Sequence, residues 1–125
     1  MEKIVRPGSR KSPLVILDSE KGIITLEGRS ILEDTISFYE PILNWIKEYI
    51  NSPQDTTVNI AFDYFNSTSA RILLLLLQSV QQIKSSGKTL IINWYYAEND
   101  ENIKESGMDF AALVKETFNF IIKNN

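Results

Sequence analysis

A cluster of small polar residues is the part of this sequence best suited to chemistry. Asn66, Ser67, Thr68 and Ser69 follow a β-rich run and precede a long apolar run typical of a helix. The first N–H groups of a helix have no partner within the helix and carry the positive end of its dipole, which favours an anion or a phosphate ester. Two interpretations stay open: one of these residues caps the helix, or one of the hydroxyls is phosphorylated.

Carboxylates offer a second kind of chemistry. Asp63, Glu98 and Asp100 are expected near the ends of neighbouring strands, and paired carboxylates act as general acid and base when a pocket raises the pKa of one of them. The alternative function is therefore a small hydrolase or isomerase that uses Asp63 and the acidic residues of 98–101. The stretch 98–102 lacks the glycine and the ligand order of an EF-hand, so we expect a solvated loop and no metal site there.

The composition removes most other enzyme classes. The 125 residues include no cysteine and no histidine, which excludes thiolate nucleophiles, zinc knuckles, iron–sulfur clusters, serine–histidine triads and histidine-ligated metals. The five glycines do not occur in the spacing of a Walker loop or a dinucleotide fingerprint. A net charge of −3 gives no basic surface for nucleic acid. We expect a protein without a cofactor that does not bind nucleic acid and need not be an enzyme.

The N-terminal segment and the hydropathy bear on domain organisation and location. Residues 1–13 contain two prolines and four basic residues, which predicts an extended lead-in to a single domain over 14–125. A signal peptide would need an apolar core in this segment, and no apolar run of 18 residues occurs in the chain. We therefore expect a cytoplasmic protein that does not enter a membrane.

Hydrophobic periodicity predicts the element order β-β-α-β-α-β-α-β. Two β-rich runs that begin at Leu14 are separated by turn residues at 18–22. A helix is expected within 30–51, capped by Ser30 or Asp34 and bent or delayed by Pro41. One apolar stripe of this helix is formed by Ile36, Tyr39, Leu43, Ile46 and Ile50. The later elements are a strand, a helix, a strand, an acidic loop or short turn, a helix and a strand, over 56–65, about 69–84, 88–96, 97–107, about 108–115 and 118–122. Such strand–helix–strand units predict an α/β domain with a mixed sheet and helices packed on it.

Aromatic residues end two of the predicted strands. Tyr64 and Phe65 end the strand before the polar cluster, and Trp94, Tyr95 and Tyr96 end the strand that follows it. Core packing explains most of these residues. Tyr95 is out of phase with Trp94 and Tyr96, so we expect its ring at the surface, where a partner can contact it.

Three motifs in this order resemble the SiaC-type regulatory phosphoproteins, small bacterial domains with a fold similar to the anti-sigma-factor antagonist (STAS) class. The resemblance runs along nearly the whole chain. It is carried by residues 33–34 and 38–46, by residues 64–71, and by residues 93–96 with the acidic run after them. It implies a single STAS-like α/β domain.

The resemblance also implies a non-enzymatic switch. A dedicated serine/threonine kinase would phosphorylate a hydroxyl at the strand-to-helix turn, a metal-dependent phosphatase would remove the phosphate, and the phosphorylation state would select the partner. In such proteins the acceptor directly follows the asparagine of a tyrosine-x-asparagine turn, which is Ser67 here, with Thr68 as the alternative. The unphosphorylated form of characterised relatives is implied to bind and activate a diguanylate cyclase.

The phosphorylation hypothesis also assigns roles to residues around the turn. Asn66 and Ser69 would cap and position the turn, and Arg71 would pair with the phosphate or with an acidic partner. Apolar contact area would come from three aromatic residues, Tyr64, Tyr95 and Tyr96. A third interpretation, an obligate subunit of a larger assembly, predicts instead a large exposed apolar patch.

Overall fold

The computed structural model describes residues 1–123, which form a six-stranded sheet and three α-helices. The strands are β1 (Ile4–Arg6), β2 (Leu14–Asp18), β3 (Ile23–Ser30), β4 (Thr56–Phe65), β5 (Leu90–Ala97) and β6 (Asn119–Lys123). The helices are α1 (Thr35–Tyr49), α2 (Ser67–Val80), which continues into the 3₁₀ turn η1 (Gln81–Ser86), and α3 (Glu101–Val114).

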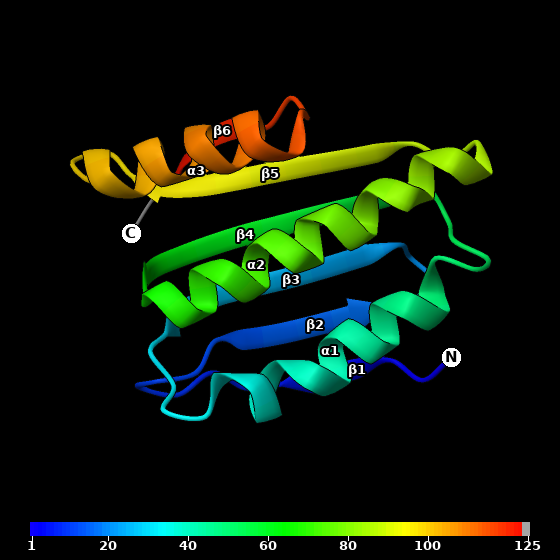
Figure 1. Cartoon of the computed structure of the whole chain (residues 1–125), viewed down its shortest axis with the longest axis horizontal. Coiled ribbons are helices and arrows are strands. Elements are labelled where there is room, and N and C mark those ends of the chain that lie inside the picture. Colours follow the sequence, from blue (N-terminus) through cyan, green and yellow to red (C-terminus); the bar gives the residue numbers. More distant parts are fainter. Residues whose placement is uncertain (124–125) are drawn as a thin grey trace.

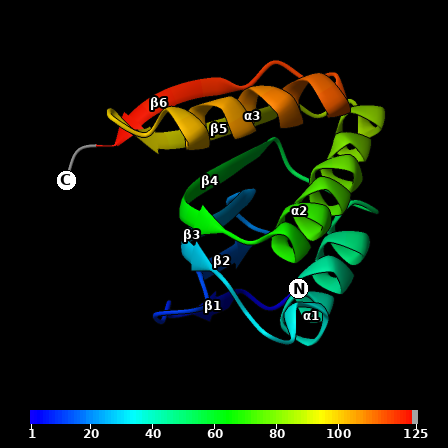
Figure 2. The ribbon, with the colours of Figure 1, turned by 60° about the vertical axis from the view of Figure 1, so that its left-hand side comes forward.

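The sheet is mixed, and its strands lie side by side in chain order from β1 to β6. The first three strands pair antiparallel, and β3 to β6 pair parallel. A helix joins each parallel pair. Because such crossovers are right-handed and the sheet grows in one direction, all three helices cover the same face of the sheet, as Figures 1 and 2 show. The opposite face carries no helix (Figure 2).

This arrangement confirms the predicted α/β class and corrects the predicted element order. The segment expected to be only a lead-in contributes β1, in which Val5 pairs with Ile16 of β2. The order therefore begins with three strands instead of two. A strand of three residues is too short to show a periodicity in the sequence, and its pairing depends on β2, not on its own composition.

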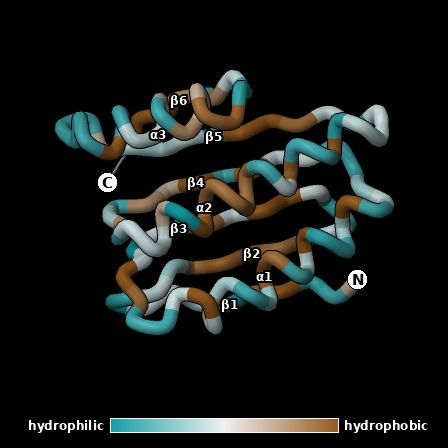
Figure 3. The backbone as a smooth tube through the Cα atoms, viewed as in Figure 1, coloured by the Kyte–Doolittle hydropathy of each residue, from teal (hydrophilic) through white to brown (hydrophobic). Residues whose placement is uncertain are grey.

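The core lies between the sheet and the helices and is formed by apolar residues of the strands and of all three helices. Figure 3 shows hydrophobic stretches along the central strands and along α1 and α2. The largest core residue is Trp94, which is fully buried and packs against Phe110 and Phe118. The indole N–H of Trp94 donates to the backbone oxygen of Ile103 at 2.9 Å. Gly107 allows this close approach, because a Cβ there would lie 2.5 Å from the indole nitrogen.

The start of α1 settles the choice between the two predicted caps. Asp34 is the N-cap, since its Oδ1 accepts from the backbone N–H of Ser37 at 3.2 Å. A hydrogen bond from the Ser37 hydroxyl, together with this backbone hydrogen bond, lowers the pKa of Asp34. Ser30 is buried at the end of β3 instead. Pro41 lies inside the helix.

The other two helices differ from their predicted bounds. Asp100 caps α3 by accepting from the N–H of Ile103 at 3.0 Å, so the stretch predicted to be an acidic loop is helical from Glu101. The α2 helix begins at Ser67 and passes into η1, which ends at Gly87 with a left-handed φ of 77°. The predicted stop at this glycine is confirmed.

Candidate functional site

The turn between β4 and α2 is fixed by the asparagine at its centre. The Oδ1 atom of Asn66 accepts from the backbone N–H of Ser69 at 2.9 Å, which makes Asn66 the N-cap of α2. Its own backbone N–H donates to the carbonyl oxygen of Ser30 at 3.0 Å. The start of α2 is therefore attached to the end of the neighbouring strand β3, and the predicted capping role of Asn66 is confirmed.

A buried chain of three hydroxyl groups lies behind this turn. The Ser69 hydroxyl donates to the carbonyl oxygen of Ser30 at 2.9 Å, and the Ser30 hydroxyl donates to Ser69 Oγ at 2.7 Å. Since the Ser30 proton is used in this way, the Tyr39 hydroxyl donates to Ser30 Oγ, at 2.6 Å. Burial raises the pKa of Tyr39 to about 12. The chain links α1, β3 and the first turn of α2 and so holds the turn in place.

Ser67 and Thr68 directly follow Asn66 at the surface end of this turn. They are the first two residues of α2, and both are exposed. Within residues 1–123 neither hydroxyl takes part in a hydrogen bond of the protein. Both therefore lie at the positive end of the helix dipole and are free to react.

Arg71 is also exposed and lies four residues after Ser67. Side chains four apart in a helix are neighbours on its surface, so the guanidinium can reach a group attached to Ser67. Ser69, by contrast, is 2% exposed. Its hydroxyl is held by Ser30 and is not accessible to a kinase.

The three tyrosines do not form one surface. Tyr64 is 54% exposed, and Tyr95 is partly exposed on the helix-free face of the sheet. Tyr96 lies on the helix side like Trp94 and is only 9% exposed, with Lys104 above its ring at 5.5 Å. The expectation that Tyr96 offers contact area is therefore wrong, because strand alternation turns it into the core.

The carboxylates of the alternative enzyme do not line a common pocket among those found in residues 1–123. Asp63 lies on the helix-free face, where it is exposed and pairs with Lys123. It lines an open depression of about 700 Å³ together with Tyr95 and Lys123, but neither Glu98 nor Asp100 lines it. The carboxylate of Asp100 is engaged as the cap of α3. No observation favours an acid–base pair of Asp63 with these residues.

Residues 1–123 contain no group of three or more Asp or Glu side chains placed to hold a metal ion. They also contain no helix long and apolar enough to cross a membrane.

Exposed apolar side chains are spread over several elements, which disfavours the obligate-subunit interpretation. Examples are Val5 on β1, Ile91 on β5 and Leu113 on α3. Two others, Ile36 of α1 and Leu75 of α2, line the same groove between their helices. Sequence reasoning missed this groove, because it placed Ile36 on the buried stripe of α1.

Sequence reasoning also missed Ser30 and Tyr39 as partners of the turn. Ser30 and Ser69 are 39 residues apart, and a hydrogen bond over that separation has no local signal. The local pattern around Ser30, a serine between a β-rich run and a predicted helix, indicates only a possible helix cap.

The fold and the turn together define a small α/β domain with two exposed hydroxyls at a rigid helix N-terminus, where a modification would change the local charge. The chain belongs to the SiaC family: residues 6–123 match the family described as SiaC family regulatory phosphoprotein. A curated relative, the uncharacterized protein PA14_02130 of Pseudomonas aeruginosa (strain UCBPP-PA14), is 19% identical over 105 residues, which cover 83% of each chain.

Solved structures show the same fold. The crystal structure of apo-SiaC from Pseudomonas aeruginosa has a TM-score of 0.84 at 19% identity and covers 99% of this chain and 100% of that one. SiaC is also the activator in the crystal structure of the diguanylate cyclase SiaD in complex with SiaC from Pseudomonas aeruginosa. That match has a TM-score of 0.83 at 19% identity and covers 95% of this chain and 97% of the other.

Proposed function

We propose that this protein is a cytoplasmic regulator whose binding to a protein partner is switched by reversible phosphorylation of Ser67, with Thr68 as the alternative acceptor. A serine/threonine kinase adds the phosphate and a metal-dependent phosphatase removes it. The observation that carries the proposal is the pair of exposed hydroxyls at the start of α2, on a turn fixed by buried hydrogen bonds. Membership of a family of regulatory phosphoproteins supports it.

The surroundings of the two hydroxyls favour Ser67. Its neighbour one helical turn later is Arg71, a cation that can form a charge-assisted hydrogen bond with a phosphate. The corresponding neighbour of Thr68 is Ile72, an apolar residue that offers no such bond. A phosphate adds about 1.5–2 negative charges beside the helix N-terminus, where the dipole stabilises them.

The proposed partner is a diguanylate cyclase. A relative with the same fold, SiaC from Pseudomonas aeruginosa, is the activator of such a cyclase. We propose that the unphosphorylated form of this chain binds a cyclase of its own organism and that the phosphate weakens this binding.

Phosphorylation is tested with the purified kinase of the same genome, ATP and phosphosite mapping by mass spectrometry. We expect a single phosphate on Ser67, lost in Ser67→Ala and kept in Ser69→Ala, which lacks the buried hydroxyl. Thr68→Ala separates the two acceptors. A phosphate confined to a site outside 67–68 would refute the switch.

Partner binding is tested with Ser67→Asp and its neutral counterpart Ser67→Asn, which has nearly the same shape. If charge is the signal, the aspartate variant binds the cyclase more weakly and the asparagine variant binds it like the unmodified protein. Equal binding of both variants and of the phosphorylated protein would contradict the proposal.

A further inference from the structure

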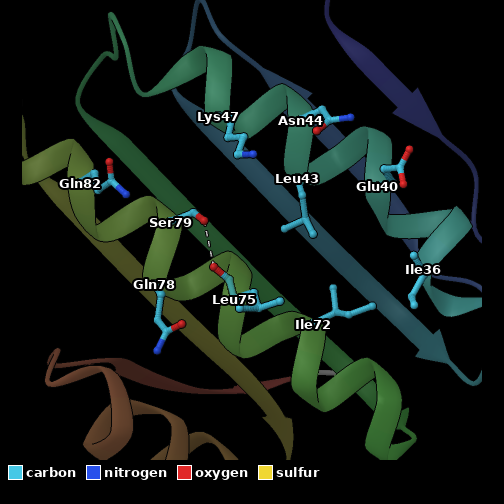
Figure 4. A pocket seen from close by; sticks show the side chains of 10 residues that line it. All are labelled: Ile36, Glu40, Leu43, Asn44, Lys47, Ile72, Leu75, Gln78, Ser79 and Gln82. Carbon is cyan, nitrogen blue, oxygen red and sulfur yellow. Dashed lines mark hydrogen bonds between the residues drawn. The ribbon is translucent and has the colours of Figure 1, made fainter.

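Apolar side chains line a groove between α1 and α2. The two helices run side by side in the same direction (Figure 1) and enclose a groove of about 530 Å³ (Figure 4). Ile36 and Ile72 lie at the end near the helix N-termini, and Leu43 and Leu75 lie further along. Ile36 is 66% exposed and Leu75 is 50% exposed. Each of the two layers thus exposes one apolar side chain, Ile36 or Leu75, whereas Ile72 is only 7% exposed.

The groove is polar at its other end and carries two charges on one wall. Gln78 belongs to α2, Gln82 to η1 and Lys47 to α1. Glu40 stands between the two apolar layers, seven residues before Lys47. Within residues 1–123 neither Glu40 nor Lys47 forms an ion pair. Both charges are therefore available to a molecule that enters the groove.

The spacing of these residues matches a helix. Ile36 and Leu43 are two turns apart, about 10.5 Å along α1. Residues i and i+7 of a helix that lies in a groove are separated by the same distance, so its apolar side chains can contact both. The negative end of an incoming helix is stabilised where α2 begins, since Asn66 caps that end without adding a charge. The carboxylate of Asp34 offsets the positive end of α1, which runs in the same direction as α2. The incoming helix is therefore antiparallel to both.

We infer that this groove is the docking surface for an amphipathic helix of the partner protein, oriented antiparallel to α1 and α2. The partner helix has an acidic residue early, opposite Lys47, and a basic residue two turns later, opposite Glu40. Between and beyond them an apolar stripe covers the two layers of the groove. This inference rests on the proposed function, because it assigns the surface that the phosphorylation state would control.

The groove is continuous with the proposed acceptors. Thr68, Ile72 and Leu75 recur at intervals of four and three, so they share one face of α2. Ser67 is the residue before Thr68, at the same helix end. A phosphate on either hydroxyl lies beside the last turn of the partner helix, whose free carbonyl groups carry negative charge. Phosphorylation thus repels the docked helix without changing the groove.

The first test measures binding of the purified cyclase of the same genome to groove variants. Ile36→Lys and Leu75→Lys place a charge in the groove at positions that are already half exposed, so the fold is kept. Leu113→Lys, at a residue of α3 that is 64% exposed, is the matched control. We expect each groove variant to weaken binding by about tenfold or more and the control to bind like the unmodified protein.

The second test does not need the cyclase. Two synthetic Ala- and Leu-based helices of about 18 residues, long enough to be helical, share one composition. One has Glu near its start and Lys two turns later, with leucines between and beyond these charges, and the other has the two charges exchanged. Amide shifts in NMR spectra should map the first peptide to α1 and α2, and it should bind a few times more tightly than the second. The double variant Glu40→Lys, Lys47→Glu should reverse this preference.

The outcomes separate the inference from the proposed function. If the cyclase binds the groove variants and the unmodified protein equally well, the groove inference is wrong and the cyclase proposal stands. If no cyclase binds but the first peptide occupies the groove with the expected polarity, the cyclase proposal fails alone. If the protein self-associates in sedimentation experiments and Leu75→Lys abolishes this association, the groove binds a second copy and the inference is wrong. Peptide-induced amide shifts confined to α3 or to the helix-free face would also overturn the inference.

Discussion

The hydrogen bonds of the buried hydroxyl chain predict how much stability the protein loses when one of its hydroxyl groups is removed. Tyr39 donates to Ser30, Ser30 donates to Ser69, and Ser69 donates to the carbonyl oxygen of Ser30. All three protons have an acceptor, in agreement with the lack of unpaired buried side-chain polar atoms in residues 1–123. Removing a hydroxyl at different points of the chain therefore has different consequences.

The position of the removed hydroxyl sets the expected magnitude. Ser69→Ala takes away the acceptor of the Ser30 proton, and a buried donor without a partner costs about 1–3 kcal/mol. Tyr39→Phe removes the first donor and leaves no proton unpaired, so it costs only the net value of one hydrogen bond, about 0.5–1.5 kcal/mol. Ser30→Ala leaves the Tyr39 hydroxyl without an acceptor and belongs with the costly changes.

Urea unfolding of the three single variants and of Tyr39→Phe, Ser30→Ala together measures these differences. Tyr39→Phe should relieve the unpaired hydroxyl of Ser30→Ala, so the double variant should lose less stability than the sum of the singles, by about 1 kcal/mol. Strict additivity, or a larger loss in Tyr39→Phe than in Ser69→Ala, would refute the proposed directions of the hydrogen bonds.

Three further predictions follow from single features of the structure. Burial raises the pKa of Tyr39 to about 12, from about 10 in the unfolded chain. The free energy of unfolding that this shift contributes is therefore complete below pH 10 and is lost as the pH rises through 12, by about 1.4 kcal/mol for each unit of pKa shift. Tyr39→Phe should lack this loss in alkaline unfolding curves. Gly107→Ala should destabilise by about 1–3 kcal/mol in urea, although alanine favours a helix, because its Cβ would meet the buried Trp94 ring; a stabilised variant would contradict this packing. Asn66→Ala should cost about 1 kcal/mol by loss of the cap, whereas Ser67→Ala should change thermal stability little, and equal losses in the two would show that Asn66 is not the cap.

The turn was predictable because its signals are local. Asn66 follows a β-rich run and precedes an apolar helix, and a side chain that accepts from the N–H three residues later needs no distant partner. The same holds for Gly87, where a left-handed φ ends η1. The α/β class followed from the alternation of strand and helix patterns.

The remaining features depend on residues far apart in the sequence. The role of Ser30 is set by Ser69 and Tyr39, and β1 exists because β2 offers it an edge. The register of α1 was misjudged for a related reason. A helix of this length has several apolar residues on adjoining faces, and only the position of α2 decides that Ile36 faces the groove instead of the core.

The rigidity of the turn determines how a phosphate at Ser67 would act. A flexible loop could move the added charge into solvent, but this turn is held by Asn66, by the Ser30 carbonyl and by the buried Ser69 hydroxyl. The charge therefore stays at the end of α2, one turn from the apolar layer that contains Ile72. Its effect should be electrostatic and local, so Ser67→Asp should alter partner binding while thermal unfolding differs little between Ser67→Asp and Ser67→Asn. A large loss of stability in the aspartate variant alone would mean that the charge acts by opening the turn.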